Sequence, residues 1–152
     1  MTTPIPTRNT SKYSGQYAGT LGSQRMVEIF ADSYKIALSS KNPDTAGDRF
    51  ALAVEAYHQF MSMESSAEAR AAVQQAMEEL VELFPTQVVA NEALGLREKA
   101  RKLKTRRKQL DLLRRASEIV DRGLTEYPSN SLLQAAATEL RTEISRSEAA
   151  AS

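Results

Sequence analysis

From residue 23 onward, large apolar side chains recur every three or four positions, the spacing of one face of an α-helix. Prolines and polar stretches interrupt this pattern, and the residue before a proline is disfavoured in a helix. The pattern predicts a first helix over residues 23–39, stopped by Pro43. It predicts a second helix over residues 45–62, capped by its first residue, and a third over residues 66–84, with Pro85 opening the next element.

The stretch over residues 86–127 has no proline, and its apolar positions form a heptad-like seam over residues 89–110. An unbroken helix of this length would be about 63 Å long, which exceeds the diameter expected of such a domain. We therefore favour two helices with a break near residues 102–105 over one long coiled-coil-like helix. A stop around Pro128 precedes the last predicted helix.

The three internal prolines, Pro43, Pro85 and Pro128, each follow a predicted helix end, at intervals of 42 and 43 residues. A fixed period of this size indicates helical repeats, in which each helix hairpin buries its apolar face on a neighbour. Coincidence is the alternative, because only two intervals are present.

Residues 116–128 resemble the second helix of a tetratricopeptide repeat, in which small and large residues alternate at set spacings before a proline. Those positions are filled here by Ala116, Val120, Gly123 and Pro128. The interval between prolines is longer than the roughly 34 residues typical of that family, and the first helices lack its motif. The resemblance implies a stack of helix hairpins that serves as a protein-binding scaffold, but it does not place the family's peptide-binding residues.

The sequence thus predicts an all-α fold of about five or six helices, paired as hairpins and stacked as a short tetratricopeptide-like bundle. We expect one helical domain over residues 23–148. Residues 1–22 are rich in Thr, Ser, Gly and Pro and are predicted to be a disordered arm, and residues 149–152 a frayed tail.

Charge is divided unevenly along the chain: residues 1–96 hold 7 Lys and Arg against 11 Asp and Glu, and residues 97–152 hold 13 against 8. A segment as rich in Lys and Arg as residues 97–115 attracts phosphates, because its binding releases counterions from them. There are three alternatives to phosphate binding. The basic segment is a solvated helix face, it pairs with the acidic stretch 64–92 of the same or another subunit, or it is a docking face for an acidic protein. The candidate contacts for a protein partner or a nucleic acid are Arg97, Lys99, Arg101, Lys102, Lys104, Arg106, Arg107, Lys108, Arg114 and Arg115.

Signals for catalysis or cofactors are few. The chain has no cysteine, which excludes disulfides, thiolate metal sites and cysteine nucleophiles, and His58 is its only histidine. The sequence shows neither a phosphate-binding glycine loop nor a nucleophile elbow. We therefore predict that the protein is not an enzyme, with no catalytic residue, metal ligand or cofactor. The lack of a long apolar run and of a secretion signal predicts a cytoplasmic protein without membrane contact.

These observations predict a non-enzymatic protein–protein interaction module, such as an adaptor, scaffold or assembly factor. The alternative is a nucleic-acid-binding accessory protein that uses the basic segment 97–115. The seam over residues 89–110 makes a homodimer an option, with Leu103 and Leu110 at its interface. Arg107 also falls on that seam, where a buried charge would need a partner.

Overall fold

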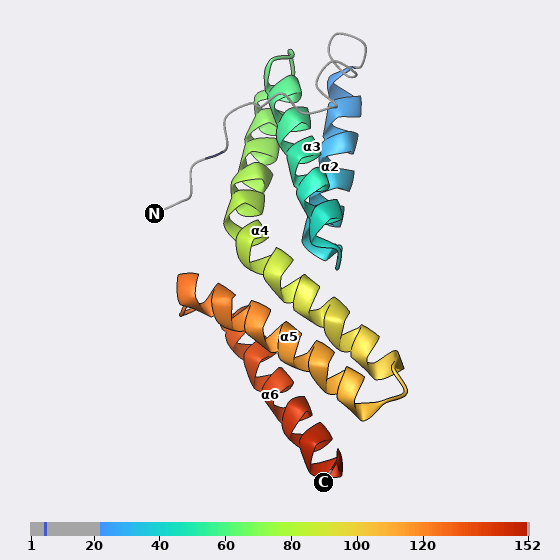
Figure 1. Cartoon of the computed structure of the whole chain (residues 1–152). Helices are drawn as coiled ribbons and strands as arrows, with labels where there is room; N and C mark the ends of the chain where they lie inside the picture. Colours follow the sequence, from blue (N-terminus) through green and yellow to red (C-terminus); the bar gives the residue numbers. More distant parts are fainter. Residues whose placement is uncertain (1–4, 6–21, 152) are drawn as a thin grey trace. The chain divides into compact units, whose positions relative to one another are not determined.

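The computed structural model describes Ile5 and residues 22–151, and the described residues form helices and short connections without a strand (Figure 1). This confirms the predicted all-α fold. The five helices in this part of the chain are α2 (Ser23–Ser39), α3 (Pro43–Met61), α4 (Ala67–Lys102), α5 (Arg106–Glu126) and α6 (Ser131–Ala151).

Three of the helix starts follow from local chemistry. Helix α3 begins at Pro43, two residues before the predicted cap, because the first helical position tolerates a residue without an N–H group. Ser66 caps α4, since its Oγ accepts a hydrogen bond from the Ala69 N–H at 3.1 Å. Asn130 caps α6 in the same way, with its Oδ1 2.9 Å from the Leu133 nitrogen.

The prediction that Pro85 separates two helices is wrong, because α4 runs through it as one helix of 36 residues. Proline has no N–H to donate to the carbonyl four residues earlier, at Val81, so the helix continues at the cost of one hydrogen bond. The predicted break near residues 102–105 is confirmed, since α4 ends at Lys102 and α5 begins at Arg106.

The chain divides into two compact units, Met1–Ser40 with Asp44–Pro85, and Lys41–Pro43 with Thr86–Ser152. The first unit is built from α2, α3 and α4 up to Pro85, which contribute apolar side chains to one core. The largest of its fully buried apolar side chains are Met26, Phe60, Met77 and Leu80.

The first core also contains polar groups and is closed by contacts at its margin. Glu55 is fully buried and accepts a hydrogen bond from the Gln59 amide at 3.2 Å. The Phe50 and Phe84 rings stack with their centroids 4.4 Å apart. The guanidinium of Arg70 donates to two backbone carbonyls at the end of α3 and just beyond it, each at 3.0 Å, and so fixes the start of α4.

In the second unit, α4 from Thr86 onward packs with α5 and α6 around its own apolar core. Ala116 and Val120 are fully buried on α5. A Cβ atom added to Gly123 would lie 3.1 Å from side-chain carbons of both Val89 and Leu133, so a larger residue fits only if these side chains shift by a few tenths of an ångström. The small-large-small spacing on α5 therefore coincides with close helix packing, while the tetratricopeptide resemblance stays a prediction.

The heptad-like seam is covered by its own unit. Ala93 and Ala100 are 2% exposed, and Leu110 is 8% exposed. Of the two leucines at the predicted dimer interface, Leu110 is buried within the chain and Leu103 is partly buried. Arg107 is exposed at the start of α5, so it is not buried within its own unit. The homodimer stays a prediction.

Most of the predicted N-terminal arm, residues 1–4 and 6–21, lies outside the described residues. Ile5 is partly buried and packs against the first core. Helix α6 continues to Ala151, beyond the expected domain end at residue 148. The single domain over residues 23–148 stays a prediction.

Candidate functional site

The predicted basic residues flank the turn between α4 and α5, and hydrogen bonds fix the conformation of this turn. The Leu103 N–H donates to the Ala100 carbonyl at 3.1 Å and continues the last turn of α4. The backbone N–H of Gln109 donates to the Thr105 carbonyl at 3.1 Å. The side-chain amide of Gln109 donates to the Leu103 carbonyl at 2.6 Å. The basic side chains therefore project from a defined backbone.

Three of the ten predicted contact residues form ion pairs with carboxylates of α6. Arg97 contacts both Glu139, at 3.0 Å, and Glu143. Glu143 also accepts from Arg101 at 3.3 Å. A separate pair joins Arg114 of α5 to Glu148 at 3.2 Å. These pairs join helices of the second unit and use acids of α6 in place of the predicted stretch 64–92.

Arg97 has a structural role in this network. Its side chain is 21% exposed, and two carboxylates contact its guanidinium. Burial alone would lower the pKa of Arg97, but hydrogen bonds and charge from Glu143 and Glu139 outweigh it and raise that pKa above its ordinary value. We therefore separate Arg97 from the residues available to a partner.

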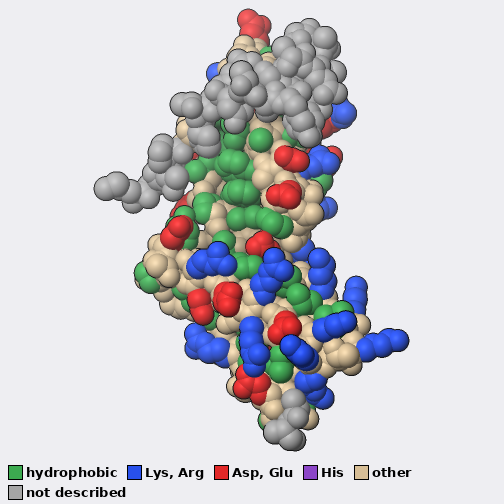
Figure 2. Space-filling view, in the orientation of Figure 1, with side chains coloured by type: hydrophobic (Ala, Val, Ile, Leu, Met, Phe, Trp, Pro, Cys, Tyr) green, Lys and Arg blue, Asp and Glu red, His purple; other side chains and the backbone are tan. Residues whose placement is uncertain are grey.

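The other seven predicted contact residues are exposed and form no ion pair with the carboxylates that the structure describes. We call this set the basic corner. Figure 2 shows Lys and Arg side chains gathered over the second unit, with carboxylates between some of them. The basic corner consists of Lys99, Lys102, Lys104, Arg106, Arg107, Lys108 and Arg115.

The two helix ends at the basic corner differ in electrostatics. Cations in the last turn of α4, among them Lys99 and Lys102, lie at the negative end of a helix dipole, where they are stabilised. The first turn of α5 has no acidic residue, and the Thr105 side chain makes no capping hydrogen bond. The first N–H groups of a helix have no partner within the helix, so positive side chains in the first turn disfavour the helix and an anion there is favoured.

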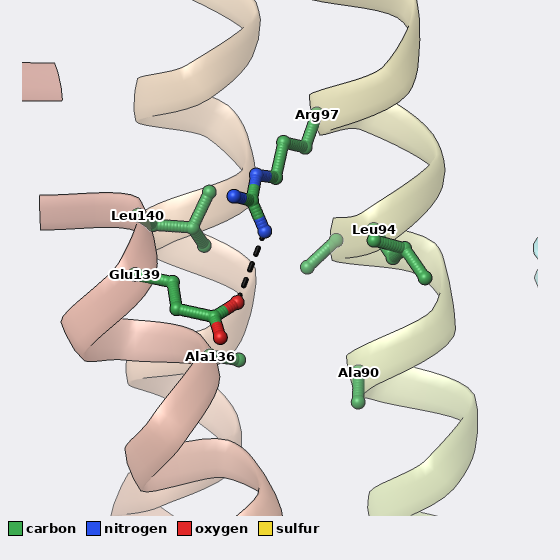
Figure 3. Close-up of a pocket in the computed structure, with 7 residues that line it drawn as sticks. Ala90, Leu94, Arg97, Ala136, Glu139 and Leu140 are labelled. Carbon is green, nitrogen blue, oxygen red and sulfur yellow. Dashed lines mark hydrogen bonds and ion pairs between the residues drawn. The ribbon is translucent and has the colours of Figure 1, made fainter. Parts of the chain in front are cut away.

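A shallow groove lies between α4 and α6 in the same unit (Figure 3). Leu94 and Ala136 contribute to its apolar lining, and the Arg97–Glu139 ion pair lies along it. Its volume is about 40 Å³. This is room for one or two water molecules, far less than a small-molecule site of roughly 300 Å³ or more needs.

The sequence did not reveal the α6 carboxylates as partners, although one signal was present. Arg97 and Arg101 are four residues apart, as are Glu139 and Glu143. Four residues place each pair on one helix face, so two such faces can meet as a ladder of ion pairs. The spacing fixes the faces, but only the fold shows which helices meet.

Comparison of the chain with protein-family models, curated proteins and solved structures found no match. Within the described residues, no group of three or more His, Asp or Glu side chains is placed to hold a metal ion. No helix in the described part of the chain is long and apolar enough to cross a membrane.

Proposed function

We propose that this protein is a non-enzymatic interaction module whose basic corner binds the phosphate backbone of a nucleic acid. The observation that carries this proposal is a set of seven exposed cations on the end of α4, the connection to α5 and the first ten residues of α5, without ion pairs to the described carboxylates. Each such cation can replace a counterion condensed on a phosphate chain, and the entropy of the released counterions drives binding.

A duplex fits this surface better than a single strand. Residues 86–126 contain no aromatic side chain on which an unpaired base could stack, and stacking supplies much of the affinity for single strands. The basic corner offers Lys and Arg groups and, at the start of α5, backbone N–H donors, all of which suit phosphate oxygens. We therefore propose binding to duplex backbone without reading of base sequence.

A protein partner is the second candidate, favoured by apolar side chains on the same unit. Leu94 is 40% exposed beside the α4–α6 groove, and Leu132 at the start of α6 is 41% exposed. An adaptor would use such side chains as anchors in an interface. We place this candidate second because the groove beside Leu94 is small.

The experiment is a fluorescence anisotropy titration of a labelled DNA duplex and a labelled RNA duplex, at 50 mM and 150 mM salt. The test variant changes Lys102, Arg106 and Arg107 to Ala. Its matched control changes three exposed arginines elsewhere on the second unit to Ala, with the same loss of charge. These control positions are Arg122, Arg141 and Arg146.

The proposal predicts salt-sensitive binding that falls at least 100-fold at 50 mM salt in the test variant and much less in the control. This estimate follows from roughly tenfold per lost phosphate contact at that salt. Equal losses in both variants would show that net charge matters and the basic corner does not. Binding to an acidic peptide with no binding to either duplex would replace the proposal with the adaptor function.

A further inference from the structure

Two cations at the edge of the basic corner are held by carboxylates of α6. Arg114 lies seven residues after Arg107 on α5, which places both side chains on one helix face, about 10 Å apart along the axis. Arg107 is free of described ion pairs, whereas the Arg114 guanidinium contacts Glu148 at 3.2 Å. At the end of α4, Arg101 contacts Glu143 at 3.3 Å.

The two pairs differ in their exposure to solvent. The side chains of Arg114 and Glu148 are 54% and 52% exposed, whereas in the other pair Arg101 is 56% exposed and Glu143 only 23%. Exposed ion pairs are weak, so a polyanion that approaches the same face competes on nearly equal terms with the internal carboxylate. The less exposed Arg97, with two carboxylate partners, is not open to this exchange.

We propose that α6 acts as an internal competitor for the nucleic acid, with the carboxylates of Glu143 and Glu148 holding Arg101 and Arg114 away from phosphate. This inference rests on the proposed function and adds a form of regulation to it. Neutralising or displacing these carboxylates extends the basic corner along α5 and the end of α4. In the unmodified chain, Arg101 and Arg114 therefore do not contribute to duplex binding, although they lie beside the basic corner.

Glu148→Gln is the cleanest test, because Glu143 also supports Arg97. The matched control is Glu118→Gln, which removes the same charge one helix turn from Arg114 but breaks no ion pair to a described arginine. Binding of the full-length variants to a labelled DNA duplex is measured by anisotropy at several salt concentrations. Circular dichroism checks that both variants keep their helix content.

One added phosphate contact strengthens duplex binding roughly tenfold at 50 mM salt and steepens the slope of log K against log salt by about 0.9. We expect this change for Glu148→Gln and less than half of it for Glu118→Gln. Arg114→Gln lowers affinity little in the wild-type chain, where Glu148 holds the arginine. In the Glu148→Gln background the same change removes the gain.

Equal gains in the two glutamate variants would overturn the inference and leave the proposed function standing, because general charge would then explain the effect. An equal loss on Arg114→Gln in both backgrounds would overturn it as well, since Arg114 would already contact the duplex in the wild type. Failure of every variant and of the wild type to bind at 50 mM salt would overturn both proposals. If Glu148→Gln unfolds, the pair is structural and the competitor role is wrong.

Discussion

Two charge reversals on either side of the α4–α5 turn are expected to weaken nucleic-acid binding alike but to change stability in opposite directions. Arg106 is the first residue of α5, where a cation is disfavoured by the helix dipole. Lys102 is the last residue of α4, where a cation is favoured. Both side chains are exposed and form no ion pair with the described carboxylates. Besides the hydrogen bond from Lys41, the charge of Lys102 also lowers the pKa of Glu98, so its reversal adds a repulsion that acts in the same direction as the helix end.

A charge at a helix end changes stability by roughly 0.3–1 kcal/mol, and a reversal converts one sign of this interaction into the other. Arg106→Glu is therefore expected to raise the free energy of unfolding by about 1 kcal/mol, and Lys102→Glu to lower it by about 1 kcal/mol. For a chain of this length, these values correspond to Tm shifts of about 2–4 °C up and down. Each reversal also weakens duplex binding at least tenfold at 50 mM salt, by a lost phosphate contact.

The assay is thermal unfolding followed by circular dichroism at low salt, since salt screens the dipole interaction. Anisotropy titrations on the same samples give the binding change. Tm shifts of the same sign in the two variants would refute the reasoning from the helix dipoles. We also infer that the start of α5 carries cations, at a cost in stability, because it binds an anion. If Arg106→Glu lowers the Tm and leaves duplex binding unchanged, this inference is refuted.

Three other predictions concern two glycines, the proline inside α4 and the Lys41–Glu98 contact. Gly47→Ala should raise the free energy of unfolding by about 0.5–1 kcal/mol in urea titrations, because an added Cβ meets nothing within 4 Å. Gly123→Val should lower the free energy of unfolding by about 1–3 kcal/mol through overpacking. The reverse order of stability would contradict the packing described. Pro85→Ala should raise the free energy of unfolding by about 1–3 kcal/mol, because α4 regains an interior hydrogen bond, and a loss of stability in the same titration would show that the proline is required. A hydrogen bond from Lys41 is the main cause that lowers the pKa of Glu98 in the folded chain. This carboxylate therefore stabilises the fold above its unfolded pKa near 4.5, and the stabilisation is lost as the pH falls through the lowered folded value. Lys41→Met should remove this part of the pH dependence of Tm between pH 6 and 3, and an unchanged profile would rule the contact out.

Local signals in the sequence predicted the secondary structure well where a chemical group enforces the boundary. Ser66 and Asn130 cap helices because their side chains meet free N–H groups at once, without help from distant residues. Pro85 misled the prediction because a proline inside a helix costs one hydrogen bond, which packing on both sides can offset. That compensation depends on tertiary contacts, which periodicity does not show.

The sequence identified the basic residues of the candidate site but not which of them pair with carboxylates. Ten basic residues are visible in the sequence, yet only the fold shows that Arg97, Arg101 and Arg114 meet carboxylates of α6. The same limit applies to the seam, where a heptad-like pattern fits an intermolecular coiled coil and an intramolecular bundle equally well. The fold shows that Ala93 and Ala100 of this seam are buried within the second unit.

The most direct test of the central claim is the salt dependence of duplex binding by the wild-type chain. If the basic corner contacts phosphates through its seven cations, the slope of log K against log salt approaches about −6, and a slope between about −4 and −6 supports the account. A slope near zero, or no binding at 50 mM salt, would contradict it and assign these cations to another partner.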